Sequence, residues 1–336
     1  MTRRLVVRRR SRSAASSRAG GVSNRHSRDT FACQRGTLPL PRGAERRRLG
    51  IGATLAAKAI KRIRHQPRRV RRWPPSPGRH WGRRAVTSSL PFASPALPQV
   101  IAGSGPILLL CDHASNAVPD GIDLGIEAEL LDRHIAVDIG AGDLTRTLAA
   151  RLGAPAVLAT VSRLVIDLHR PPDHSGLIPT VSDGHAIPGN VGVDRQVRIA
   201  RFHAPYHRTI ADMVRDQRPA LIAAIHSFTP ALETGGAPRP WPVGILYNRD
   251  AHAARVAIEL LRAHGFETGD NEPYSGRHLN MTLNRHAEAN GIPSLAIEVR
   301  NDGIDSPQGV AKWADILAPT LTAIVARLVP PAGTGL

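Results

Sequence analysis

From residue 101 onwards, short apolar runs alternate with longer amphipathic stretches. The runs have the length of buried strands, which are predicted at residues 108–111, 156–160, 221–225, 243–247 and 295–299, with a further short apolar run at 164–168. Apolar residues recur at mostly helical spacing in residues 130–152, 196–217, 251–264, 279–290 and 309–328. Strands that alternate with helices predict a single α/β domain, in which helices flank a mainly parallel or mixed central sheet.

Two segments depart from this regular pattern. Pro205 lies inside the predicted helix at 196–217, so an irregularity is expected there. Residues 169–194 are rich in Pro, Gly, Asp and His and show no clear period. They predict a long loop, and long loops inside compact domains are usually functional.

Three of the predicted strands end in, or carry, residues that can do chemistry. These residues are Asp112 and His113, His226 and Ser227, and Glu298 and Arg300. In an open α/β sheet, ligands bind just beyond the carboxyl ends of the strands. A single polar strand end is most simply an ordinary turn, but three of similar design favour a functional site.

The charge of the chain is concentrated in its first hundred residues. The whole chain has a net charge of +18, and residues 1–100 hold 25 basic but only two acidic residues. Arg clusters among Pro, Ser and Gly bury too little apolar surface to offset the entropy of ordering. Residues 1–100 are therefore predicted to be an Arg-rich, low-complexity, disordered extension, followed by a catalytic domain at 101–330.

Other interpretations of this extension remain open. It could bind nucleic acid through phosphates, it could be an organellar transit peptide, or the native protein could lack it. No nucleic-acid-binding motif accompanies the charge, so only nonspecific binding is expected from it. The two cysteines, Cys33 and Cys111, do not form a disulfide framework, and no secretory signal or run of about 18 apolar residues is present. These features predict a cytoplasmic protein.

The polar strand ends could hold a metal ion. Catalytic zinc takes three protein ligands from His and Asp or Glu, and zinc activates water for attack on an amide. His113 and His226 are natural ligands, and Asp138 is a candidate carboxylate because it would be costly to bury unpaired in its apolar surroundings. Asp112 is the rival carboxylate. An ion pair with a nearby Arg explains Asp138 nearly as well.

Glu298 lies in an apolar strand, where a lone carboxylate is unexpected. It could act as a general base and then as a general acid, or it could simply be neutralised by Arg300. Arg163, Arg170 and Arg300 could bind substrate carboxylates through their planar guanidinium groups, although each could equally be a surface charge.

Other chemistry fits the sequence less well. His203 and His207 are spaced i, i+4, but the acid of the usual metalloprotease order is missing, so packing or outer-shell roles are expected. No Gly-x-Ser-x-Gly motif or phosphate-binding loop is present.

Eight motifs together resemble the N-formylglutamate amidohydrolase family. Between about residues 107 and 305 they are CDHASN, HIAVDIGA, SRLVIDLHRPPD, SDGHAIPGN, FHAPYH, AIHSF, NEPYSGRH and IEVRND. A more distant similarity is to zinc carboxypeptidases, in which a His-x-x-Glu and an Ile-His-Ser supply the metal ligands. Here His113-Ala-Ser-Asn116 lacks that Glu, which leaves Asp138 as its candidate replacement, and His169 stands where an Asn is usual.

The resemblance implies zinc-dependent hydrolysis of N-formyl-L-glutamate to formate and L-glutamate, in histidine breakdown. It implies zinc ligation by His113, Asp138 and His226, and catalysis by Glu298 with Arg300. The substrate-binding residues expected from it are Arg163, Arg170, Ser115, Asn116 and Tyr274. The alternatives are a nucleic-acid-binding protein that acts through the basic segment, and a catalytically silent paralogue that binds acyl amino acids.

Overall fold

A computed structural model describes residues 96–328, so the predicted extension falls outside the described residues except for its last five. A seven-stranded sheet with the order β1-β3-β2-β6-β9-β7-β8 forms the centre of this part. Its strands are β1 (Gln99–Ile101), β2 (Ile107–Cys111), β3 (Ala156–Leu158), β6 (Leu221–Phe228), β7 (Val243–Leu246), β8 (Thr268–Asp270) and β9 (Ser294–Arg300). The four strands β3, β2, β6 and β9 are parallel, whereas β1 and β7 join this group antiparallel.

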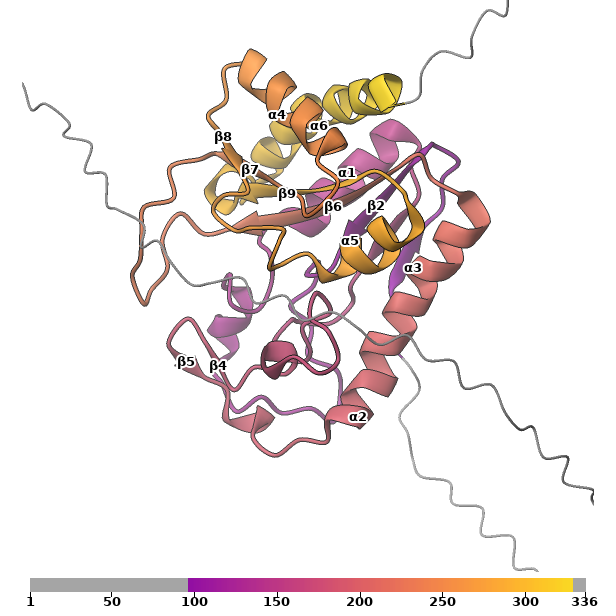
Figure 1. Cartoon of the computed structure of the whole chain (residues 1–336). Helices are drawn as coiled ribbons and strands as arrows, with labels where there is room; N and C mark the ends of the chain where they lie inside the picture. Colours follow the sequence, from indigo (N-terminus) through magenta and orange to yellow (C-terminus); the bar gives the residue numbers. More distant parts are fainter. Residues whose placement is uncertain (1–95, 329–336) are drawn as a thin grey trace, which may run out of the picture. The chain divides into compact units, whose positions relative to one another are not determined.

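Helices cover both faces of the sheet (Figure 1). On one face, α1 (Ala141–Leu152), α4 (His252–Ala263) and α6 (Pro307–Leu328) bury their apolar sides in one core cluster. On the other, α3 (Ala204–Gln217) and α5 (Met281–His286) contribute to a second cluster. The predicted α/β fold with a mainly parallel, mixed sheet is confirmed.

The predicted helix at residues 130–152 is wrong in its first half. Residues Ala128–Asp132 form one short 3-10 turn, η1, and α1 begins only at Ala141. The chain turns sharply at Gly140, which has a left-handed φ of 76°. Glycine is required there because a Cβ would collide with the carbonyl of Ile304. The turn carries Asp138, whose backbone N–H donates to the carbonyl of His113 at 3.1 Å.

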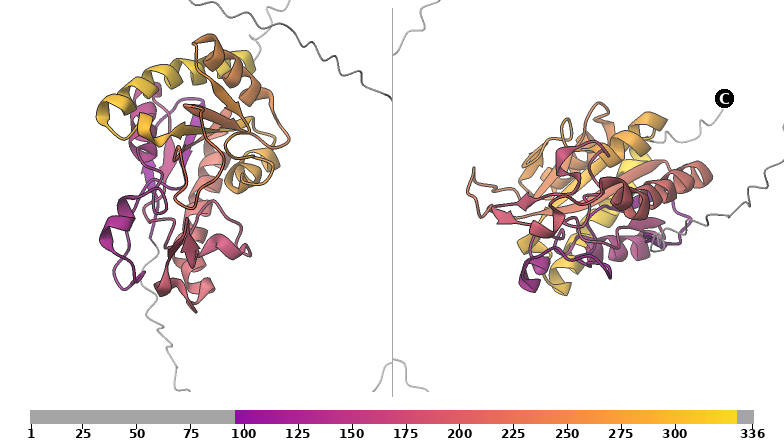
Figure 2. Two further views of the ribbon diagram at one scale, coloured as in Figure 1. Left: turned by 90° about the vertical axis from the view of Figure 1, so that its left-hand side faces the viewer. Right: turned by 90° about the horizontal axis from the view of Figure 1, so that it is seen from below.

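The predicted irregularity around Pro205 is a change of helix type. A short α2 (Arg195–Arg198) continues into a π-helical stretch, Ile199–His203, and then into α3. The apolar run at 164–168 is buried but forms turns, not a strand. The long loop contains 3-10 turns and the small hairpin of β4 (Val181–Ser182) and β5 (His185–Ala186). Segments of this region, in pink, lie away from the yellow α6 in the left view of Figure 2.

One described helix, α6, is long and apolar enough to cross a membrane by length and composition alone, with a mean hydropathy of 1.2. A membrane-spanning segment was not predicted from the sequence. The helix nevertheless buries Trp313, Leu317, Leu321 and Ile324 against the other helices and the sheet, as core helices also do.

Candidate active site

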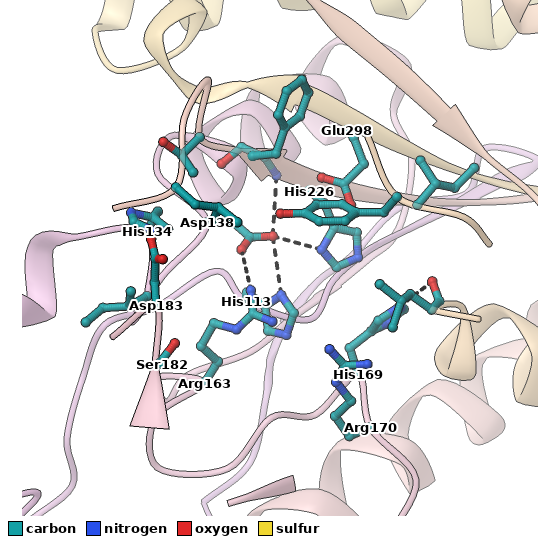
Figure 3. Close-up of a pocket in the computed structure, with 18 of the residues that line it drawn as sticks. His113, His134, Asp138, Arg163, His169, Arg170, Ser182, Asp183, His226 and Glu298 are labelled. Atoms are coloured by element: carbon teal, nitrogen blue, oxygen red, sulfur yellow. Dashed lines mark hydrogen bonds and ion pairs between the residues drawn. The ribbon is translucent and has the colours of Figure 1, made fainter. Parts of the chain in front are cut away.

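A cavity of about 360 Å³ lies at the carboxyl ends of the parallel strands (Figure 3). Because β2, β6 and β9 run in the same direction, His113, His226 and Glu298 meet at one edge of the sheet. The register pairs His226 directly with Glu298 on the neighbouring strand. The cavity is lined by these three residues and by Asp138, Arg163, His169, Arg170 and Tyr274, among others.

Two histidines and one carboxylate converge in this cavity. Oδ2 of Asp138 lies 3.3 Å from Nδ1 of His113 and 2.8 Å from Nδ1 of His226. All three residues are buried, and their ligand atoms lie within 4.8 Å of one another. This donor set is suited to a divalent metal ion such as zinc.

The outer nitrogen of each of these histidines faces a further carboxylate. Nε2 of His113 lies 2.8 Å from Oδ1 of Asp167, and Nε2 of His226 lies 3.4 Å from Oδ2 of Asp112. Buried carboxylates of this kind orient metal-binding histidines and fix their tautomers. Burial alone would raise the pKa of Asp112, but its interactions with the nearby His169 and His226 rings hold this pKa well below its usual range.

His169 and Asp112 also form part of a second group. Nδ1 of His169 lies 2.8 Å from Oδ2 of Asp112, and the hydroxyl of Thr282 donates to Oδ1 of Asp112 at 3.0 Å. Asp112, His169 and His226 offer ligand atoms within 4.8 Å of one another. Asp112 itself does not line the cavity, so this group is less open to a substrate than the group around Asp138.

Arg163 and Arg170 face the cavity in different ways. The two terminal nitrogens of Arg163 donate to Asp138 at 3.1 Å and to Asp167 at 2.9 Å. Arg170 lies farther from Asp167, with 3.7 Å between its Nε atom and Oδ2, and its guanidinium group points toward the cavity (Figure 3). Arg163 therefore neutralises the carboxylates of the site, and Arg170 is better placed to meet a substrate anion.

Glu298 is buried beside this centre. Its Oε2 atom has no hydrogen-bond partner among the described residues, although the side chain is only 7% exposed. Burial raises the pKa of Glu298 to about 7; the nearby Asp138 adds to this effect and His226 opposes it. A carboxyl group with such a pKa can accept and return a proton near neutral pH.

The structure does not bring all the predicted site residues together. Arg300 ends β9 and turns to Asp302 and to the carbonyl of Pro240, at 2.8 and 3.0 Å, and it does not line the cavity. Ser115 and Asn116 line a separate neighbouring cavity of about 530 Å³.

The remaining predicted residues have clear positions. Tyr274 does line the main cavity, and its hydroxyl accepts a hydrogen bond from Arg239 at 3.0 Å. His203 and His207 are buried, outside the lining of the main cavity.

Sequence reasoning missed Asp167, which contacts both His113 and Arg163. The sequence nevertheless contained a signal for it, because Asp167 is an isolated acid in the apolar run at 164–168, just as Asp138 is an isolated acid among apolar neighbours. The contact between His169 and Asp112 could not be read from the sequence, since the two residues are 57 positions apart.

The fold and the site define an α/β enzyme with a buried centre of histidines and carboxylates at the carboxyl edge of its sheet. The family model of N-formylglutamate amidohydrolase matches residues 105–304, and the chain belongs to this family. It is therefore a hydrolase that acts on a non-peptide carbon–nitrogen amide bond.

Solved structures that are similar to this chain include two with TM-scores above 0.5. A gene product of Agrobacterium tumefaciens is 30% identical, with a TM-score of 0.66, over 69% of this chain and 96% of its own. The N-formylglutamate amidohydrolase of Ralstonia eutropha JMP134 is 20% identical, with a TM-score of 0.57, over 70% of this chain and 100% of its own. No curated protein matches the chain by sequence.

Proposed function

We propose that the protein is a metal-dependent hydrolase of N-acyl amino acids, with N-formyl-L-glutamate as its substrate. The observation that supports this most is the convergence of His113, His226 and Asp138 beside the unpartnered oxygen of Glu298. Catalytic zinc sites combine three such protein ligands with one open position. The products would be formate and L-glutamate, and we infer a cytoplasmic role in histidine breakdown, as the family resemblance implies.

The residues present fit a zinc ion at this position. Both histidines direct Nδ1 toward Asp138 and Nε2 toward an outer carboxylate, so each ring has one nitrogen for the metal and one for a positioning partner. This arrangement favours Asp138 over Asp112 as the carboxylate ligand. Zinc, when bound at such a site, activates water and polarises the carbonyl of the substrate.

The chain's own residues would supply the proton transfers and the orientation of the substrate. Glu298 would take the proton of the attacking water and deliver it to the amine nitrogen that leaves. Arg170 would bind a carboxylate of the amino acid, and Tyr274 would contact the substrate across the cavity. Arg163 would keep Asp138 and Asp167 ionised and in place.

The test is an acyl-release assay on zinc-loaded protein with N-formyl-L-glutamate, N-formyl-L-alanine and N-acetyl-L-glutamate. We expect formate release from N-formyl-L-glutamate, with the highest kcat/KM of the three compounds. A zinc-loaded protein that binds these compounds but releases neither formate nor acetate would refute the proposal. Preferred cleavage of N-acetyl-L-glutamate would correct the acyl group while leaving the reaction type intact.

A further inference from the structure

Behind the cavity, on the side of α3 and α5, lie three buried histidines that the proposed mechanism does not use. They are His203, the last residue of the π-helical stretch that leads into α3, His207 on α3 and His286 on α5, with exposed fractions of 2%, 1% and 3%. The rings of His203 and His207 are 4.2 Å apart between centroids, and those of His207 and His286 are stacked at 5.2 Å. An i, i+4 spacing places the first two on one face of the helix.

The hydrogen bonds of this cluster end on the backbone of the active site. Nε2 of His207 lies 3.0 Å from the carbonyl oxygen of Leu168, and Nε2 of His203 lies 3.0 Å from the carbonyl oxygen of Arg170. Nδ1 of His207 lies 2.9 Å from Nε2 of His286. The two carbonyls stand on either side of residue 169, so His203 and His207 hold this short segment at two points.

The partners determine where the protons are. A carbonyl oxygen only accepts, so Nε2 of both His203 and His207 must donate. Burial holds the pKa of His207 well below its usual value, so this ring is neutral and its Nδ1 atom accepts. His286 must then donate from its Nε2 atom. All three rings therefore share one tautomer, and a directed relay runs from His286 through His207 to Leu168.

The segment that the relay holds carries several functions. Asp167 contacts His113 and Arg163, and it also accepts a hydrogen bond from the backbone N–H of His169 at 3.0 Å. Arg170 directs its guanidinium group toward the cavity. A displacement of this turn by a fraction of an ångström would move the group that meets the substrate anion.

We propose that His207, supported by His286 and joined by His203, is a positioning residue that sets the placement of Arg170 for substrate binding. This role rests on the proposed function, because it assigns Arg170 to the carboxylate of the substrate. It extends that function, because none of the three histidines lines the cavity or touches the reacting atoms.

The kinetic test compares His207→Leu with His207→Gln in the full, zinc-loaded chain. Leu removes the donor to Leu168 and leaves His286 without its acceptor, so we expect kcat/KM to fall roughly 10- to 100-fold, mostly through KM. Gln can donate from its amide nitrogen and accept at its amide oxygen, so KM should return toward that of the wild type. The matched control is Leu321→Ala, a fully buried change in α6 on the other face of the sheet.

The result that would overturn the positioning role is a KM for His207→Leu equal to that of Leu321→Ala at a similar loss of Tm. A second measurement uses the wild-type protein and depends neither on the folding of a variant nor on enzyme activity. Nitrogen NMR of the histidine rings in the wild-type protein should show the Nε2–H tautomer for His203, His207 and His286. An Nδ1–H tautomer at His207 overturns the relay, whereas absence of acyl release by the wild type refutes the proposed function instead.

Discussion

At the scale of single residues, the site depends on two histidine rings whose nitrogens face carboxylates. His113 and His226 both direct Nδ1 to Asp138, while their Nε2 atoms face Asp167 and Asp112. A metal ion bound between the Nδ1 atoms and Asp138 would replace the contacts that these three side chains now make with one another. The site can therefore be dissected one ligand at a time.

We predict that His113→Ala and His226→Ala each lose bound zinc on dialysis, because two remaining ligands cannot hold a tetrahedral site. Asp138→Asn should lose it as well. Asp112→Asn removes only an outer partner, so it should retain a zinc site that is weakened roughly 10- to 100-fold. The measurement is zinc per chain by elemental analysis, and full zinc occupancy in Asp138→Asn together with loss in Asp112→Asn would assign the ligand to Asp112.

For Glu298→Gln, we predict normal zinc content and substrate affinity, with kcat reduced roughly 10²- to 10⁴-fold. Gln has nearly the same shape as Glu but cannot accept the proton of the attacking water. If Glu298 were only a structural partner of other charges, Tm would fall and kcat would change little. A folded, zinc-loaded Glu298→Gln protein with near-normal kcat would therefore refute the role of this residue.

Predictions from the sequence were most successful for individual residues. An isolated acid in an apolar stretch drew attention to Asp138 and Glu298, and both line the cavity. The same criterion applied to Asp167 would have found it. Arg300 pairs with Asp302, two residues later. The sequence contains both residues, but their spacing alone did not favour this ion pair over a role of Arg300 in the cavity.

At the scale of elements, the sequence predicted most strands and helices but not their neighbours. That β6 and β9 are adjacent, with His226 paired to Glu298, depends on strand order, which local pattern does not determine. The short edge strands β1 and β8 were missed because three residues are too few to show a period. The helix expected from residue 130 failed because Gly140 turns the chain before α1 begins.

The packing of α3 against α5 predicts sensitivity to acid. Burial, with a further contribution from Arg285, lowers the pKa of His286 to about 4, against 6.5 for an unperturbed histidine. Between these values the unfolded chain binds a proton that the folded chain does not, so stability is full above pH 6.5 and falls as the pH decreases toward 4.

The check is Tm as a function of pH for the wild type and His286→Gln, which removes this titrating group. We expect the wild type to lose more Tm than the variant between about pH 7 and pH 4.5. Equal losses of Tm in the two proteins would show that unfolding does not add a proton to His286 in this pH range. His264→Gln is the matched control, because His264 is exposed at the end of α4.

At the scale of the whole molecule, every buried residue of the two core clusters lies between Ile107 and Ile324. The cavity residues also lie within this range. The charge asymmetry of the sequence had already separated a basic first hundred residues from a mildly acidic remainder. The catalytic domain proposed at 101–330 therefore contains both the core and the candidate site.

We predict that deletion of residues 1–95 leaves acyl release and Tm close to those of the full chain. A protein whose main function were nucleic-acid binding through the basic segment would lose that function on the same deletion. The measurements are kcat/KM and Tm of both forms. A truncated protein that fails to fold, or that folds and has lost hydrolysis, would show that the first 95 residues are part of the catalytic unit.

The claim that joins the three scales is that His113, Asp138 and His226 hold a metal on which amide hydrolysis depends. The most direct test is formate release from N-formyl-L-glutamate by chelator-treated protein, to which zinc is returned in steps. We predict that the treated protein is inactive, that activity rises in proportion to added zinc, and that it reaches its maximum at one ion per chain. Undiminished formate release by protein shown to contain no metal would contradict this account.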